Sequence, residues 1–295
     1  MAHSPSCEHC PGSHAGERPC LASATVKPRS WLLLEHPGPW APKIEKMGIP
    51  VISEAARAGV RPQLIRRPGR RRTAPPTRVY VGWSGDDPWM EAREVTDPAE
   101  FAELDLAAVA RGRRPLFGEP VEDPLVLVCT HGKRNVCCAR TGAPLARGLA
   151  ERYGDLVWET THVGGDRFAA NMVCMPHALY YGDLDDSSAR DAVDAYLRGE
   201  VALERLRGRA GRPEAAQAAE HFVRERTGLM GIDEVRAISV TGNGPYMTRV
   251  TARGDIWSGT IELVESPSFC GSECDVSVQT YQMRGLALHS EAALV

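Results

Sequence analysis

An apolar strand, a helix and a second apolar strand follow one another in the middle of the chain, and this order restricts the fold more than any other feature. The segment PLVLVCT (124–130) is a short apolar run, residues 141–153 carry apolar side chains at helical spacing, and DLVWETT (155–161) is again strand-like. A strand–helix–strand unit within one sheet takes a right-handed crossover, so its two strands should be parallel. This order predicts an α/β protein.

The segments on either side extend the pattern. Upstream, a helix near 52–58 separates the strand-like WLLLEH (31–36) from PQLIRR (62–67), which predicts another parallel pair. Downstream, a helix ends at Thr227 and alternating segments then predict a β-meander. No internal repeat of fixed period is visible. The other expected elements are strands at 77–83, 170–176 and 178–184, a helix at 187–197, and meander strands at 233–241, 246–252 and 255–263.

We divide the chain into four parts on this basis. Residues 1–30 contain Cys, His, Pro, Gly and Ser without an apolar period, and we expect a flexible arm there. Residues 31–115 form a smaller N-terminal α/β unit, and residues 120–205 form the second α/β unit. Residues 206–295 form a C-terminal region with one helix and several strands.

Composition excludes several classes of function. With 43% hydrophobic and 25% charged residues, the chain of 295 residues is typical of a globular protein, and its net charge of −3 predicts no general affinity for nucleic acid or membranes. The longest apolar runs are too short to span a bilayer. No basic and apolar leader precedes Trp31, so we expect a cytoplasmic protein. Fingerprints of dinucleotide, nucleotide or serine-hydrolase sites are absent from the sequence.

Cysteines are numerous for a chain kept in a reducing compartment, where clustered thiols more often bind metal or perform redox chemistry than form disulfides. The segment LVLVCTHGKRNVCCARTGAP (125–144) alone holds three of them. These thiols could pack in the core, act as nucleophiles or hold a metal. The nine cysteines are Cys7, Cys10, Cys20, Cys129, Cys137, Cys138, Cys174, Cys270 and Cys274.

Two loops of the central unit should converge, because ligands collect at the carboxyl ends of parallel strands. Cys129 ends the first strand and Cys138 follows in its loop, whereas His162 and Asp166 follow the second strand. Thiolates and imidazoles bind zinc or iron–sulfur clusters, and this mixed set is similar to a [2Fe–2S] site with one nitrogen-ligated iron. Five neighbours would bring backbone amides or positive charge close to it: Gly164, Gly165, Arg167, Lys133 and Arg134.

The segments CTHGKRNVCCA, WETTHVGGDRFAANMV and HALYYGDL, with WLLLEHPGPW upstream, closely resemble the actinobacterial sucrase/ferredoxin-like family over roughly residues 20 to 205. The resemblance implies a thioredoxin-like [2Fe–2S] ferredoxin fold, which we place at 120–205. It also implies ligation by two Cys and two His, as in the family's eukaryotic relatives. Cys129, Cys138 and His162 match three of these positions, and Asp166 stands at the fourth.

The departure at Asp166 leaves three alternatives. Asp166 ligates iron, or another side chain such as His131, Cys137 or a tail cysteine takes the fourth place, or the cluster has been lost. Cys174 lies within an apolar strand and is expected in the core. The short motifs Cys7-x2-Cys10 and Cys270-x3-Cys274 are weak signals for metal sites.

These observations predict a soluble electron carrier with a [2Fe–2S] cluster, rather than an enzyme. A redox partner, a reductase or flavoprotein, could dock on the arginine-rich stretch Arg57–Arg78, which contains no acidic residue. One alternative is a thiol-dependent redox enzyme that uses Cys137 or Cys138 at a helix N-terminus. The other is a zinc-binding or cluster-free module of the same fold.

Overall fold

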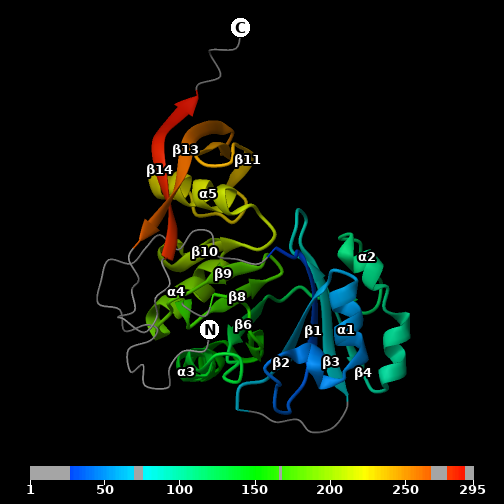
Figure 1. Ribbon diagram of the computed structural model, residues 1–295. Coiled ribbons are helices and arrows are strands. Elements are labelled where there is room, and N and C mark those ends of the chain that lie inside the picture. Colours follow the sequence, from blue (N-terminus) through cyan, green and yellow to red (C-terminus); the bar gives the residue numbers. More distant parts are fainter. Residues whose placement is uncertain (1–26, 70–75, 166–167, 267–277, 290–295) are drawn as a thin grey trace.

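A ten-stranded mixed sheet and a separate four-stranded sheet form the framework of the protein (Figure 1). The computed structural model describes residues 27–69, 76–165, 168–266 and 278–289. Within these residues the mixed α/β class predicted from the sequence is confirmed. The strands of the large sheet are β1 (Ser30–Glu35), β2 (Arg61–Arg66), β3 (Thr77–Trp83), β4 (Trp89–Val95), β5 (Glu119–Pro120), β6 (Leu125–Cys129), β7 (Val157–Thr160), β8 (Met172–Met175), β9 (Leu179–Tyr181) and β10 (Leu206–Arg209).

The helices connect these strands and cover the outer faces of the sheet. None of the helices in the described ranges is long and apolar enough to cross a bilayer. Short 3₁₀ turns lie at Ile44–Met47, Pro98–Glu103, Gly154–Leu156 and Leu203–Arg205. The α-helices are α1 (Pro50–Arg57), α2 (Leu106–Ala110), α3 (Val136–Tyr153), α4 (Asp186–Leu197) and α5 (Glu214–Thr227).

The large sheet consists of two halves with the same arrangement. Its strand order is β10-β9-β8-β6-β7-β2-β1-β3-β4-β5. In each half a strand, a helix and a parallel strand are followed by an antiparallel hairpin and a helix, as β1-α1-β2-β3-β4-α2 and as β6-α3-β7-β8-β9-α4. The expected parallel pairs and the expected hairpin at β8–β9 are therefore confirmed. The likeness of the two halves is a finding of the structure.

The halves meet where β2 pairs antiparallel with β7, and we call this junction the seam. The ladder is short, with Ile65 opposite Thr160 and Arg66 opposite Glu159. Side chains reinforce it. The Arg66 guanidinium lies 2.7 Å from the Glu159 carboxylate, and that of Arg67 stacks 3.6 Å from the centroid of the Trp158 ring.

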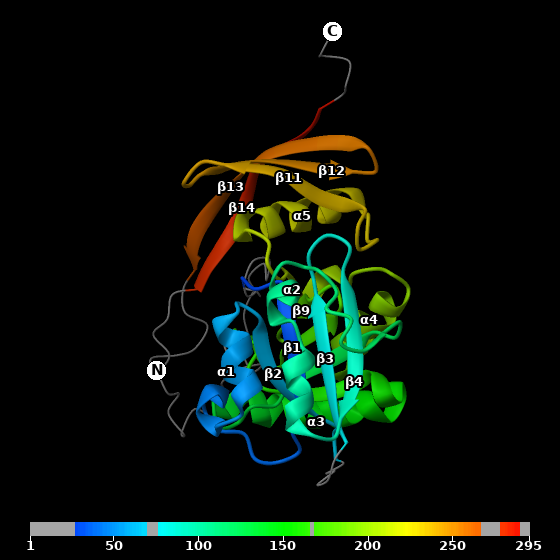
Figure 2. The same ribbon diagram turned by 90° about the vertical axis from the view of Figure 1, so that its right-hand side faces the viewer.

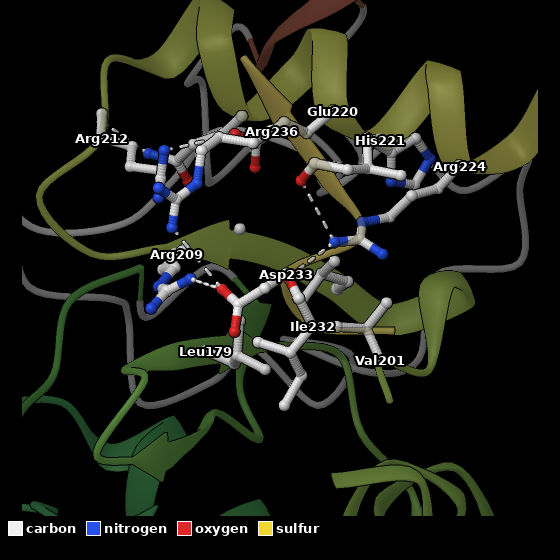
Figure 3. A pocket seen from close by; sticks show the side chains of 14 residues that line it. Leu179, Val201, Arg209, Arg212, Glu220, His221, Arg224, Ile232, Asp233 and Arg236 are labelled. Carbon is white, nitrogen blue, oxygen red and sulfur yellow. Dashed lines mark hydrogen bonds and ion pairs between the residues drawn. The ribbon is translucent and has the colours of Figure 1, made fainter. Parts of the chain in front are cut away.

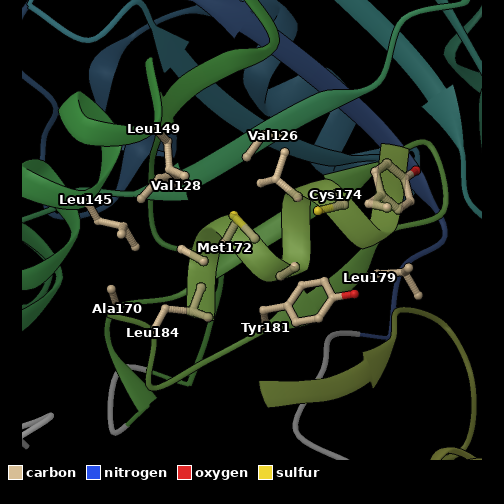
Figure 4. Close-up of a cluster of buried hydrophobic side chains, with 14 of the residues drawn as sticks. Val126, Val128, Leu145, Leu149, Ala170, Met172, Cys174, Leu179, Tyr181 and Leu184 are labelled. Atoms are coloured by element: carbon tan, nitrogen blue, oxygen red, sulfur yellow. The ribbon is translucent and has the colours of Figure 1, made fainter. Parts of the chain in front are cut away.

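Strand side chains alternate between two kinds of core. One face of both halves contributes to a shared cluster that includes Trp31, Tyr80, Trp158 and Tyr180. The opposite faces pack under helices: α1 and α2 cover the first half, and α3 and α4 cover the second. Cys174 is fully buried in the second of these clusters, which confirms its predicted place in the core (Figure 4).

Helix α3 begins at Val136, five residues before the predicted start at Thr141. Asn135 caps it, because its side chain accepts a hydrogen bond from the backbone N–H of Cys137 at 2.9 Å. The apolar period of this helix starts only at Leu145, so the sequence pattern did not reveal the first turns. Cys137 and Cys138 consequently lie inside the helix, and their predicted place before it was wrong.

The C-terminal region packs α5 between the β10 edge of the large sheet and the small sheet (Figures 1 and 2). The predicted meander is confirmed, and a fourth strand extends it. Strands β4, β5, β10 and β14 were missed, and β10 carries the large sheet beyond residue 205. The strands of the small sheet are β11 (Val235–Thr241), β12 (Tyr246–Ala252), β13 (Asp255–Ser266) and β14 (Val278–His289).

Polar contacts hold α5 on β10 around a small cavity of about 20 Å³, and we call this region the α5–β10 interface (Figure 3). Buried Arg209 donates to Asp233 at 3.0 Å. Arg224 donates to the carbonyls of Gly231 and Ile232 at 2.8 and 3.0 Å. His221 lines the same cavity, and its Nδ1 has no hydrogen-bond partner among the described residues. The region is thus fixed by hydrogen bonds as well as by apolar contact.

Gly142 allows α3 to cross closely over the end of β6. A Cβ atom at this position would overlap the backbone carbonyl oxygen of Cys129. We expect Gly142→Ala to reduce the free energy of unfolding by about 2 kcal/mol, because neither backbone can move away freely. Gly148→Ala, in the same helix, meets only the Asp186 side chain at 3.2 Å and should gain up to about 1 kcal/mol of helix propensity. Urea denaturation of both variants checks this, and equal effects would contradict the close crossing.

Acid should reduce the stability of the protein through His221 at the α5–β10 interface. Burial, and secondly Arg224, lower the pKa of His221 to about 4, whereas an unfolded histidine titrates near 6.5. Between these values the unfolded state binds more protons, so stability is lost as the pH falls from 6.5 to 4. The loss is up to about 3 kcal/mol for this residue. Urea denaturation at several pH values should give a flatter profile for His221→Gln than for the wild type. The exposed-site variant His289→Gln should keep the wild-type slope.

Candidate metal centre

Cys129, Cys138 and His162 come together at the carboxyl ends of the parallel pair β6–β7. Cys129 is the last residue of β6, Cys138 lies in the first turn of α3, and His162 follows β7. Their three ligand atoms all lie within 4.8 Å of one another. Both thiols are 1% exposed, and His162 is partly exposed. The convergence of the two loops expected from the sequence is therefore what the structure contains.

Hydrogen bonds within the group favour a thiolate at Cys129. The Cys138 thiol is the largest influence, followed among the favourable ones by His162, and together they hold the pKa of Cys129 well below its usual value although burial raises it. The Sγ of Cys138 lies 3.8 Å from Nδ1 of His162. Nδ1 is thus the ring atom that faces the thiols, and Nε2 lies on the other edge of the ring.

His131 supports His162 from behind. Its Nδ1 accepts a hydrogen bond from the backbone N–H of His162 at 3.2 Å, and its Nε2 lies 2.9 Å from the carbonyl oxygen of Ala41. These partners require a neutral ring with the proton on Nε2. Burial lowers the pKa of His131, which favours the same state. Because both ring nitrogens are engaged, His131 is a positioning residue here.

The loop after His162 approaches a buried arginine. Gly164 and Gly165 both have positive φ, at +98° and +71°, and a Cβ atom at Gly165 would collide with the Arg207 guanidinium. Arg207 lies on β10, is 0% exposed, and donates to the Gly164 carbonyl at 3.3 Å and to Asn171 Oδ1 at 2.6 Å. The two glycines therefore bring a fixed positive charge under the loop.

The other predicted residues fall into three groups. Lys133 and Arg134 are exposed in the loop between β6 and α3. Cys137 is buried but is not part of the ligand group. Several candidates lie outside the described residues: Asp166, Arg167, Cys7, Cys10, Cys20, Cys270 and Cys274.

Sequence reasoning missed Arg207, and it used Arg61 only as part of a basic stretch. Arg61 begins β2 and donates to the backbone carbonyl of His162 at 3.2 Å, across the seam. Neither residue had a local signal, because each reaches the site from a strand distant in the chain. Only the pairing of the strands brings them to the loop.

The donor set suits a soft or borderline metal. Thiolate sulfur and imidazole nitrogen are ligands of zinc and of iron–sulfur clusters. Three donors within 4.8 Å match one tetrahedral ion, and a cluster would draw on the same three together with a fourth ligand. A buried thiolate with no metal would depend on hydrogen bonds alone for its stabilisation. The residues present therefore fit a bound metal group.

Comparison with known proteins identifies relatives of this chain. "Altered inheritance of mitochondria protein 32" of Meyerozyma guilliermondii is 31% identical over 101 residues, 30% of this chain. The match covers 36% of that protein, so the chain spans about a third of the length of this curated relative. No solved structure matches the chain. The family described as sucrase/ferredoxin-like matches residues 21–208, and the chain belongs to this sucrase/ferredoxin-like family.

Proposed function

We propose that the protein is an electron carrier that holds a [2Fe–2S] cluster through Cys129, Cys138, His162 and one further ligand. The observation that carries the proposal is the buried group of two thiols and an imidazole at the carboxyl ends of β6 and β7. When bound, such a cluster accepts and releases one electron at a time. The protein's part is to hold the ligands and to set the charge around them.

The arrangement of the second half supports a thioredoxin-like domain. Its strand order, β7-β6-β8-β9, combines a parallel pair with an antiparallel hairpin, and α3 and α4 cover one face. The first half has the same order, so both are proposed to be thioredoxin-like. Only the second half brings Cys and His together among the described residues.

Each neighbour has a definite task in this proposal. His131 and Arg61 hold the backbone N–H and carbonyl of His162, which fixes the imidazole against the thiols. Arg207 places a buried positive charge next to the Gly164–Gly165 loop. A cation there stabilises the more negative, reduced form of the centre and raises its potential.

The fourth ligand remains a choice between side chains. Asp166 follows His162 by four residues, at the position that the family resemblance gives to the fourth ligand. His131 is disfavoured because both of its nitrogens have partners. Cys137 is disfavoured because it lies outside the ligand group. We therefore propose Asp166, with the tail cysteines as the other candidates.

A single zinc ion is the second candidate occupant. Three donors within 4.8 Å agree with one tetrahedral ion, for which sulfur and nitrogen lie about 2.3 and 2.0 Å from the metal. A thiol-dependent enzyme is less well supported. Cys137 and Cys138 are only 3% and 1% exposed, whereas reactive thiols are partly open to solvent.

A redox partner would approach on the partly exposed side of His162. In the basic stretch proposed for docking, Arg66 and Arg67 stack on Trp40 and Trp158 and therefore serve the fold. Exposed Arg57 and, nearer the centre, Arg134 are better placed to attract an acidic surface. We propose a reductase or flavoprotein as this partner.

Absorption and EPR spectra of anaerobically purified protein test the cluster. We expect a brown protein with equal amounts of iron and acid-labile sulfide, and an EPR signal after reduction. Cys138→Ser should lose at least nine-tenths of the iron because it removes a ligand. Its neighbour Cys137→Ser should keep the iron. A colourless protein with one zinc per chain would favour the second candidate, and a metal-free protein after anaerobic reconstitution would contradict both.

Arg207 should tune the reduction potential without binding the metal. Arg207→Met removes a buried charge and should lower the midpoint potential by roughly 40 mV, equivalent to about 1 kcal/mol for one electron. Arg207→Lys keeps the charge and should shift the potential much less. Redox titration followed by EPR measures both variants at equal iron content. Equal potentials in all three proteins would exclude an electrostatic role for Arg207.

A further inference from the structure

A cleft of about 420 Å³ opens beside the candidate metal centre, on the seam between the two halves. One wall comes from the first half, from residues 42–45 and 61–63. The other comes from the second half, from the loops after β6 and β7. This volume is within the range of small-molecule sites in proteins. His162 lines the cleft as well as the metal centre, so an occupant would lie against the edge of its ring.

The lining of the cleft is positively charged. Lys43, Arg61 and Arg134 line it, against one carboxylate, Glu45. None of the three cations forms an ion pair with a residue in the described part of the chain. Many other arginines do, as Arg66 and Arg209 illustrate. These three cations therefore concentrate a positive potential inside a recess.

The cations come from different elements, and one of them is held in place. Lys43 precedes the 3₁₀ turn Ile44–Met47, Arg61 begins β2, and Arg134 lies in the loop before α3. The Arg61 guanidinium donates to the His162 carbonyl and lies 5.9 Å from the centroid of the Trp31 ring. A positioned guanidinium with a second cation on its own wall and a third on the facing wall suits a group with several anionic oxygens.

We infer that this cleft binds a small organic anion carrying a phosphate or carboxylate group. The Arg61 guanidinium would donate hydrogen bonds to the anionic oxygens, and Lys43 on the same wall and Arg134 on the facing wall would add positive charge around them. Apolar surface of Pro42 and Pro62 would contact the remainder of the molecule. An anion bound there adds negative charge beside His162. Its effect on electron transfer rests on the proposed function, but its binding does not.

Isothermal titration of the purified protein with glycerol 3-phosphate and with succinate tests the inference. We expect saturable binding of at least one of them at low ionic strength. The double variant Lys43→Ala/Arg134→Ala should weaken this binding at least tenfold. The matched double variant Lys46→Ala/Arg147→Ala removes the same charge from exposed positions outside the cleft lining and should weaken it less than twofold.

The outcomes of these titrations decide whether the cleft binds an anion. Binding of the phosphate alone, of the dicarboxylate alone or of both supports the site and identifies its anion. Absence of saturable binding heat with both probes would overturn the proposed site. Equal weakening by the two double variants would also overturn it, because attraction of the anion would then depend on the net charge of the protein only. The same titration on Cys138→Ser should agree with the wild type within twofold. A colourless protein that binds the anion would thus contradict the proposed cluster but support the proposed anion site.

Discussion

The antiparallel contact of β2 with β7 is the interaction on which the rest of the molecule depends. It converts two similar five-stranded halves into one sheet although its ladder contains only two residue pairs. Additional bonds lengthen it beyond the ladder. Leu64 and Thr161 exchange hydrogen bonds of 3.0 and 3.1 Å, and Glu159 accepts from both Thr130 and Arg66. Burial of these bonds makes the seam costly to open.

The candidate metal centre derives its geometry from this seam. His162 lies one residue beyond Thr161, and its backbone is held by Arg61 from the first half and by His131 from the second. A shift of β2 against β7 would therefore displace the imidazole from the thiols. On the other side, Gly142 sets how closely α3, and with it Cys138, approaches Cys129. The ligands are thus positioned by strand pairing and helix packing, which are rigid compared with loops.

The sequence predicted the local elements well and named the three side chains that the structure brings together, because both depend on short-range patterns. Apolar runs located β1, β2, β3, β6 and β7, and the end of each strand located Cys129 and His162. The start of α3 was misplaced because a side-chain cap at Asn135, not an apolar period, determines it. The seam, the likeness of the halves and Arg207 were beyond local reasoning. They depend on which strand edges meet, and residues 66 and 159 are paired by that meeting alone.

The two halves share an arrangement but differ in the chemistry at equivalent positions. Cys129 ends β6 opposite Thr160, and the corresponding last residue of β1, Glu35, lies opposite Ile65. Ile65 and Thr160 are themselves partners across the seam, so these two positions are related by its approximate symmetry. Glu35 is buried and accepts a hydrogen bond from the backbone N–H of Arg78 at 3.1 Å, which is a structural use of the site. One half therefore supplies the candidate metal donors, and the other supplies Lys43 and Arg61 to the cleft that faces them. Joining the two halves places the proposed anion-binding cleft directly against His162, a candidate ligand, and neither half could form this arrangement alone.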